Sequence, residues 1–200
     1  ALSYVSSGAD NNVGIGVQAG ANIVSGSGNI CIGTFSLHDN VVACDNTAVG
    51  CFSLRSEGSG GNTVVGHDAL SADVSGYGNT CVGCESLTQP GFYYVITPDQ
   101  TSKNTTIGYR TMYTNIESKD NVAIGSGALQ NSSVANRNVC IGYESMRSDP
   151  NYSYEENVCI GNQAMFKNTE NYNVCVGNNA MYNPLRCTYT TCVGHSALYS

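Results

Sequence analysis

The sequence predicts an all-β fold, a parallel β-roll or β-solenoid of about eleven coils of 16–17 residues each. The main observation is a nine-residue motif: Asn, Val/Ile/Thr, a small residue, Ile/Val, Gly, two variable positions, Ala/Ser and Leu/Met, as in residues 121–129. A second observation is that most successive motifs begin 16 or 17 residues apart. A short, nearly constant period is typical of a solenoid in which each repeat packs only on its neighbours.

The first element of each repeat is its anchor residue. An Asn at the same place in every coil can stack its side-chain amide on the next, which forms a ladder that satisfies backbone groups at a buried corner. The degenerate last anchor is Thr190. The predicted ladder comprises Asn12, Asn29, Asn46, Asn62, Asn79, Asn104, Asn121, Asn138, Asn157 and Asn173.

The second element is a short strand, because the residues after the anchor alternate with period two. The Gly that follows permits a sharp bend or the close approach of a neighbouring backbone. The Ala-Leu or Ser-Met pair then begins a second short segment. A repeat of 16–17 residues is too short for a βα unit, and eleven strands ~4.8 Å apart would rise roughly 50 Å.

The alternation also predicts association, because both faces of the strand are apolar. The middle strand position is small, as in Ala48, Cys140 and Cys159, and its Val, Ile or Thr neighbours point to the opposite face. A strand buried on both faces needs a second covering layer. We therefore expect a parallel homotrimer, intertwined or side by side. The alternative is a wider monomeric solenoid whose interior takes the Val/Ile stripe.

Composition narrows the class of protein. Charged residues make up 12% of the chain and the formal net charge is −7. With no basic stripe, this argues against nucleic-acid binding. No apolar run approaches the length of a membrane span. The repeat covers residues 1–200 as a single domain, and Ala1-Leu2 matches the close of a repeat, which predicts a segment of a longer array.

Ten cysteines would suggest a disulfide scaffold, but their positions do not. Cys44 and Cys187 fall in connecting segments and are the better disulfide candidates. Six further cysteines occupy the small inward position of the strand, where cysteine acts as a buried hydrophobe. These are Cys31, Cys81, Cys140, Cys159, Cys175 and Cys192.

One column of variable residues suggests a metal site. The position after the Gly is Cys51, His67 and Cys84 in three consecutive coils, so these side chains would stack one strand spacing apart. Facing a trimer axis, they would form rings of His or Cys. The alternative is a coincidence of outward positions, since neighbouring coils carry Thr34 and Tyr109 there. The expectation for the chain as a whole is that it has no metal or other cofactor.

The long insertion at about residues 88–103 interrupts the 17-residue rhythm. Its aromatic residues Phe92, Tyr93 and Tyr94 supply rigid contact area, so this loop is the first candidate for contact with a receptor or glycan. The alternative is that the loop packs over the flank of a coil. Asn131 and Asn151 begin Asn-x-Ser/Thr sequons in connecting segments and are candidate glycosylation sites.

Two other function classes compete with a structural one. The Ile-Gly-x-x-Ala-Leu pattern echoes the hexapeptide repeat of left-handed β-helix acyltransferases, but only about one hexapeptide per coil conforms. The histidines His38, His67 and His195 are scattered, so we expect the chain not to be an enzyme. A Thr stripe suggests an ice-binding solenoid but covers only four coils, at Thr47, Thr63, Thr80 and Thr105.

The Asn-x-x-Ile/Val-Gly-x-x-Ala/Ser motif resembles the YadA-like head repeats of trimeric autotransporter adhesins and related repeats of phage and large-virus fibres. The resemblance spans essentially residues 1–200. It implies a left-handed, trimeric β-roll that serves as a fibre, spike or adhesin on a cell or virion surface. This chain departs from the pattern in its longer coils, in the Leu/Met after the Ala/Ser and in its many cysteines.

Overall fold

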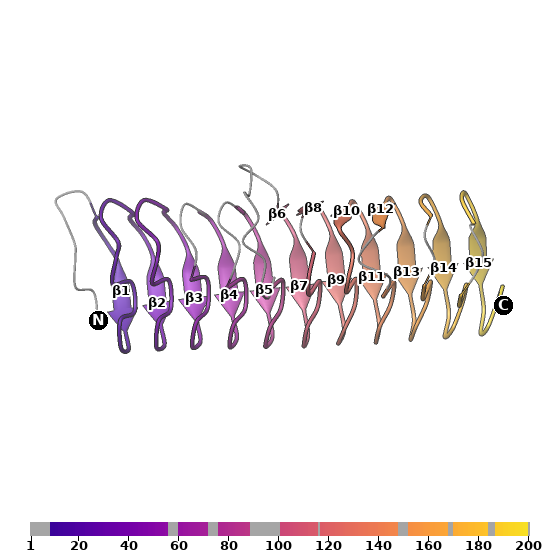
Figure 1. The fold of residues 1–200 in the computed structure, drawn as a ribbon, viewed down its shortest axis with the longest axis horizontal. Helices are drawn as coiled ribbons and strands as arrows, with labels where there is room; N and C mark the ends of the chain where they lie inside the picture. The colour runs from indigo at the N-terminus through magenta and orange to yellow at the C-terminus, as the bar shows by residue number, and fades with distance from the viewer. Residues whose placement is uncertain are drawn as a thin grey trace.

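A computed structural model of the chain describes residues 9–55, 60–71, 76–88, 101–115, 117–147, 152–167, 170–183 and 187–199. These residues form two parallel sheets and no helix. The coils follow one another in a single row, with the first and last strands at opposite ends (Figure 1). The predicted all-β parallel solenoid is confirmed. Within the described ranges, there is accordingly no helix that could cross a membrane.

The larger sheet has eleven strands, one from each repeat of the motif. Each strand pairs in parallel with the strand of the next coil, and equivalent motif positions face each other, as Cys140 and Cys159 do. The strands in order are β1 (Val13–Ile15), β2 (Ile30–Ile32), β3 (Thr47–Val49), β4 (Thr63–Val65), β5 (Thr80–Val82), β7 (Thr105–Ile107), β9 (Val122–Ile124), β11 (Val139–Ile141), β13 (Val158–Ile160), β14 (Val174–Val176) and β15 (Thr191–Val193).

A smaller sheet lies on a second side of the middle coils. It has four parallel strands in the order β12-β10-β8-β6, each ending two residues before an anchor Asn. This sheet was not predicted from the sequence, because its strands share no repeated motif. They are β6 (Thr101–Ser102), β8 (Glu117–Lys119), β10 (Val134–Asn136) and β12 (Ser153–Glu155).

The anchor residues form the predicted ladder. The side-chain oxygen of Asn104 accepts hydrogen bonds from both the backbone N–H and the side-chain amide of Asn121, at 3.1 and 2.9 Å. The Asn121 amide also donates to the carbonyl of Ala135, at 2.7 Å, just beyond the corner. The ladder runs from Asn12 to Asn173 and ends at the backbone N–H of Thr190. Asn121 thus links the anchors of the two neighbouring coils and also holds the backbone just before the next anchor.

The glycines after the strands form a second continuous column. At Gly83, φ is +135°, and a Cβ added there would lie 2.3 Å from the carbonyl oxygen of Gly108 in the next coil. No side chain fits at that distance. The residue before each anchor also has positive φ, whether it is Gly78 at 66° or Asp120 at 58°. The backbone therefore bends in the same way in every coil, which keeps the coils in register.

The core is thin and built mainly from three motif positions, with Ile23, Ala135 and Tyr154 as further buried residues. The middle strand residue points inward, as Ala48, Val64 and Cys81 do, and all three are buried. The Ala/Ser and Leu/Met positions are buried opposite them. They lie in a turn, and the Leu or Met takes a positive φ, as at Leu54 and Met146. The second segment of the repeat is therefore a turn, whose N–H groups bond to the next coil, as from Leu54 to Ala69.

Candidate functional site

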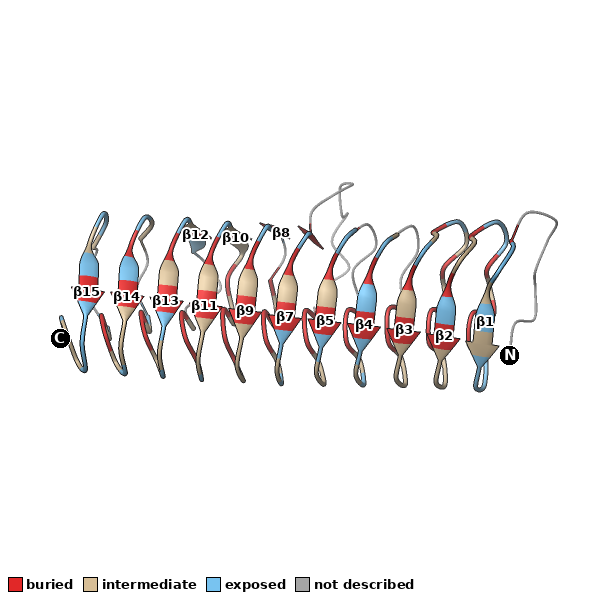
Figure 2. Ribbon diagram, turned by 180° about the vertical axis from the view of Figure 1, so that it is seen from behind, coloured by how far each residue is buried: buried red, intermediate tan, exposed pale blue. Residues whose placement is uncertain are grey.

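The outward face of the eleven-stranded sheet is the first candidate site. In each of β2–β5, β7, β9, β11 and β13–β15 the middle residue is buried, whereas the flanking residues are half-buried or exposed (Figure 2). The flanking residues are Val, Ile or Thr throughout the sheet. The exposed large ones are Val13, Ile15, Ile30, Val65, Val82, Ile107, Ile160, Val174 and Val193.

This apolar face is continuous along the row of coils. Strands ~4.8 Å apart, each with three residues rising ~3.3 Å, give eleven strands an area of roughly 500 Å². This is within the range of about 300–600 Å² for the largest apolar patch of a typical soluble monomer, and such patches are often functional. The wider monomeric solenoid is not what the chain forms, because the Val/Ile stripe lies outside and the small residues lie inside.

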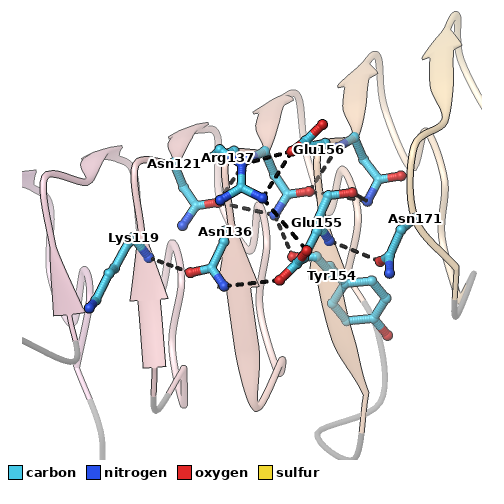
Figure 3. Close-up of polar contacts among 10 residues, drawn as sticks. Lys119, Asn121, Asn136, Arg137, Tyr154, Glu155, Glu156 and Asn171 are labelled. Atoms are coloured by element: carbon cyan, nitrogen blue, oxygen red, sulfur yellow. Dashed lines mark hydrogen bonds and ion pairs between the residues drawn. The ribbon is translucent and has the colours of Figure 1, made fainter.

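The face of the smaller sheet differs in chemistry. Arg137 pairs with Glu155 and Glu156, with N–O distances of 3.6 and 2.9 Å, and the side chain of Asn136 donates to Glu155 (Figure 3). The backbone N–H of Lys119 in turn donates to the side chain of Asn136. Exposed ion pairs of this kind contribute about 0–1 kcal/mol each and leave the surface hydrated. The face of the smaller sheet is therefore polar and hydrated, whereas the outward face of the larger sheet is apolar.

The metal hypothesis for Cys51, His67 and Cys84 gains no support. The three residues do lie in consecutive coils, but His67 pairs with the adjacent Asp68 at 3.0 Å. Among the residues that the structure describes, no group of three or more His, Cys, Asp or Glu side chains is placed to hold a metal ion. Rings formed with neighbouring chains stay a prediction.

The predicted contact and glycosylation sites fall mostly outside the described residues. Phe92, Tyr93 and Tyr94 of the insertion lie there, and so does Asn151. Asn131 is described and half-buried, and its side-chain oxygen accepts a hydrogen bond of 2.9 Å from the Thr114 hydroxyl.

The cysteines confirm their predicted role as core residues. The six at the inward position are buried, and Cys44 and Cys187 are free thiols rather than disulfide partners within the chain. In the last coils the sulfur of Met165 lies 3.2 Å from that of Cys159. Burial raises the pKa of the Cys31 thiol to about 11 and that of Cys159 well above its usual value. The thiols of Cys31 and Cys159 are therefore held in the protonated, unreactive form.

The structure also locates the histidines of the acyltransferase hypothesis and the threonines of the ice-binding hypothesis. His38 pairs with Asp39 and His67 with Asp68, but the two histidines occupy different motif positions. The four threonines of the stripe are in register on β3, β4, β5 and β7. Ile30 on β2 and Val122 on β9 flank the stripe, so it is one section of the apolar face.

A cleft of about 200 Å³ that was not predicted from the sequence lies between the coils that begin at Asn104 and Asn138. Its walls are Tyr109 and Tyr143, which follow the motif Gly in coils two apart. Its lining comprises Tyr109, Arg110, Ser126, Gly127, Gln130, Tyr143, Glu144 and Arg147. The signal for it was present as the series Tyr, Ser, Tyr at one motif position in three successive repeats.

Comparison of the chain with protein-family models, with curated proteins and with solved structures finds no match. The resemblance to trimeric adhesin heads therefore rests on the repeat motif alone.

Proposed function

We propose that this chain is a structural segment of a surface fibre, spike or adhesin, in which three copies associate through the apolar face of the eleven-stranded sheet. The fibre stands outside a cell or on a virion, and its connecting segments present side chains to a receptor or glycan. The role is mechanical, with no chemical step assigned to the chain. The observation that carries the proposal is the continuous row of half-buried and exposed Val, Ile and Thr along the sheet.

A second copy of the same chain is the occupant that best fits this face. The face is a straight strip with the same repeat along its whole length, so only a partner with the same repeat matches it at every coil. Its width is a single three-residue strand. That three copies meet, with their strips turned toward one axis, is what the resemblance to trimeric adhesin heads implies.

The test is the mass of the protein in solution, measured by light scattering during size-exclusion chromatography. The proposal requires a particle of three times the 21.0 kDa of the chain. The variant Ile107→Glu places a charge in the middle of the face, where Ile107 is 42% exposed. Burying an unpaired carboxylate at an interface costs several kcal/mol, so this variant should lose the trimer.

Val42→Glu is the matched control. Val42 is 57% exposed and lies in a connection away from the sheet, so its variant should keep the mass of the wild type. A monomeric wild type, or equal loss of association in both variants, would refute the proposed interface.

A further inference from the structure

We propose that the cleft between Tyr109 and Tyr143 binds a six-membered saccharide ring, which inserts between the two tyrosines above Ser126 and Gly127. The cleft belongs to one chain, so binding there does not require the proposed trimer. A saccharide site would give a fibre of this kind a defined ligand class and place of attachment.

The aromatic stacks of the same solenoid show what the spacing of the coils accommodates. Where adjacent coils carry aromatic residues at one motif position, their rings stack face to face. Phe35 and Phe52 lie 5.3 Å apart between ring centroids, and Phe166 and Tyr182 lie 5.0 Å apart. The distance between coils therefore suits a continuous column of rings.

Tyr109 and Tyr143 occupy a different motif position from these stacks, directly after the motif Gly, and lie two coils apart with Ser126 in the coil between them. The backbone N–H of Gly127 bonds to the carbonyl of Tyr109, and that of Glu144 bonds to Ser126, so the three coils are in register. Ser126 stands between the tyrosines and carries only a hydroxymethyl group. Two coil spacings of ~4.8 Å put the tyrosine positions roughly 10 Å apart. A ring placed between them lies about 5 Å from each, as in the stacks above.

The glycine beside Ser126 also favours an open cleft. At this motif position every other described coil has a side chain on a residue of positive φ, such as Asp68 at 52°, Glu144 at 48° and Gln163 at 48°. Gly127 has φ of 66°, so its backbone conformation does not require glycine. A Cβ there would lie 3.2 Å from the side-chain oxygen of Gln130. The effect of the glycine is to leave the cleft open.

The polar rim selects the kind of ring. The hydroxyl of Ser126 and the amide of Gln130 can both donate and accept hydrogen bonds, as saccharide hydroxyls do. Burial opposes ionisation of Glu144, but hydrogen bonds from Gln163 and Arg147 outweigh it, and the pKa of this carboxyl lies below its usual value. Glu144 is therefore a charged acceptor at the edge of the cleft. A purely apolar ring would make no hydrogen bonds to Ser126 and Gln130.

The charge of the rim argues against a phosphorylated ligand. Arg110 pairs with Glu85 at 2.6 Å, and its guanidinium lies over the rings of Tyr109 and Tyr113. Arg147 pairs with Glu144. Both cations are already neutralised, so little positive charge remains for a phosphate. A neutral saccharide needs none.

The decisive variant is Ser126→Tyr, which places a ring of the protein itself between Tyr109 and Tyr143. Ligands are a panel of tetrasaccharides of glucose, N-acetylglucosamine, galactose and uronic acids, tested by saturation-transfer NMR at millimolar concentration. The wild type should bind at least one of them. Ser126→Tyr and Gly127→Gln should lose that binding, and Tyr143→Ala should weaken it roughly tenfold.

Asn162→Tyr is the matched control, because it adds a ring on the far side of Tyr143 and leaves the cleft open. Its saccharide affinity should equal that of the wild type. Circular dichroism and thermal unfolding establish that each variant is folded. Binding of no tetrasaccharide, or equal binding by wild type and folded Ser126→Tyr, overturns the inference. Binding of adenosine monophosphate or a tyrosyl peptide in the cleft, in place of saccharides, also overturns it. The mass measurement above tests the trimer separately.

Discussion

At the scale of single residues, the fold depends on side chains that each satisfy two coils at once. Asn121 accepts two hydrogen bonds from Asn138 and donates one to the carbonyl of Ala135. It is 1% exposed, so water cannot replace these bonds. This role could be predicted from the sequence, because an Asn that recurs once per coil at a nearly constant spacing must stack on its equivalents in the neighbouring coils.

Asn121→Ala should lower the free energy of unfolding by roughly 2–4 kcal/mol, because buried partners in two coils lose their hydrogen bonds. Chemical denaturation followed by circular dichroism measures the change. Asn178→Ala is the control, since Asn178 is exposed and its side chain lies outside the ladder. A similar small effect in both variants would contradict the ladder as a source of stability.

The glycine column offers a second test at this scale. Gly83→Ala combines a φ that alanine rarely adopts with a contact of 2.3 Å to the next coil. Gly194 in the last coil has φ of +125° but no heavy atom within 4 Å of an added Cβ. Gly83→Ala should therefore destabilise the protein by roughly 2 kcal/mol or more beyond Gly194→Ala. Equal losses in thermal unfolding would mean that close packing between coils is unimportant.

At the scale of elements, the larger sheet could be predicted from the sequence and the smaller one could not. The strands of the larger sheet repeat one pattern, so that their register follows from the anchors. The strands of the smaller sheet, such as Glu117–Lys119 and Ser153–Glu155, share neither residue types nor a common pattern. These four strands align because each ends two residues before an anchor Asn, and the anchors hold successive coils in register. The cleft was missed for a different reason, since the series Tyr109, Ser126 and Tyr143 marks it in the sequence but the motif treats that position as variable.

The inward column of the larger sheet predicts a dependence of stability on pH. Burial raises the pKa of Cys31 from its usual 9.0 to about 11 in the folded chain. The unfolded chain therefore loses this proton more readily, and stability is fully present below about pH 9 and falls as the pH rises toward 11. Cys31→Ala uses the residue that Ala48 places in the same position of the next coil.

Between pH 9 and 11 the wild type should lose up to roughly 1.4 kcal/mol per pH unit more than Cys31→Ala. Urea denaturation of both proteins at pH 7, 9 and 10.5 measures this difference. Parallel pH profiles would show that Cys31 is hydrated in the folded protein, contrary to its burial.

At the scale of the whole molecule, a strip of apolar surface runs along a solenoid whose core comes mainly from three motif positions per coil. Such a thin core gives each coil few contacts of its own, and stability is then close to a sum of neighbouring pairs. The insertion between Asn79 and Asn104 shows that such a solenoid tolerates extra residues within one coil. It adds residues to one coil, yet β5 and β7 on either side of it pair in register.

The direction of the hydrogen bonds sets how the molecule responds to force. Both sheets and the asparagine ladder bond along the axis of the row, so a pull applied at its two ends loads these contacts one after another. Coils should therefore peel from an end singly, each 17-residue coil releasing roughly 60 Å of chain. The coil between Asn79 and Asn104 should release about half as much again. Single-molecule extension in optical tweezers would reveal this as a regular staircase with one longer step, whereas a single abrupt rupture would mean that the coils yield together.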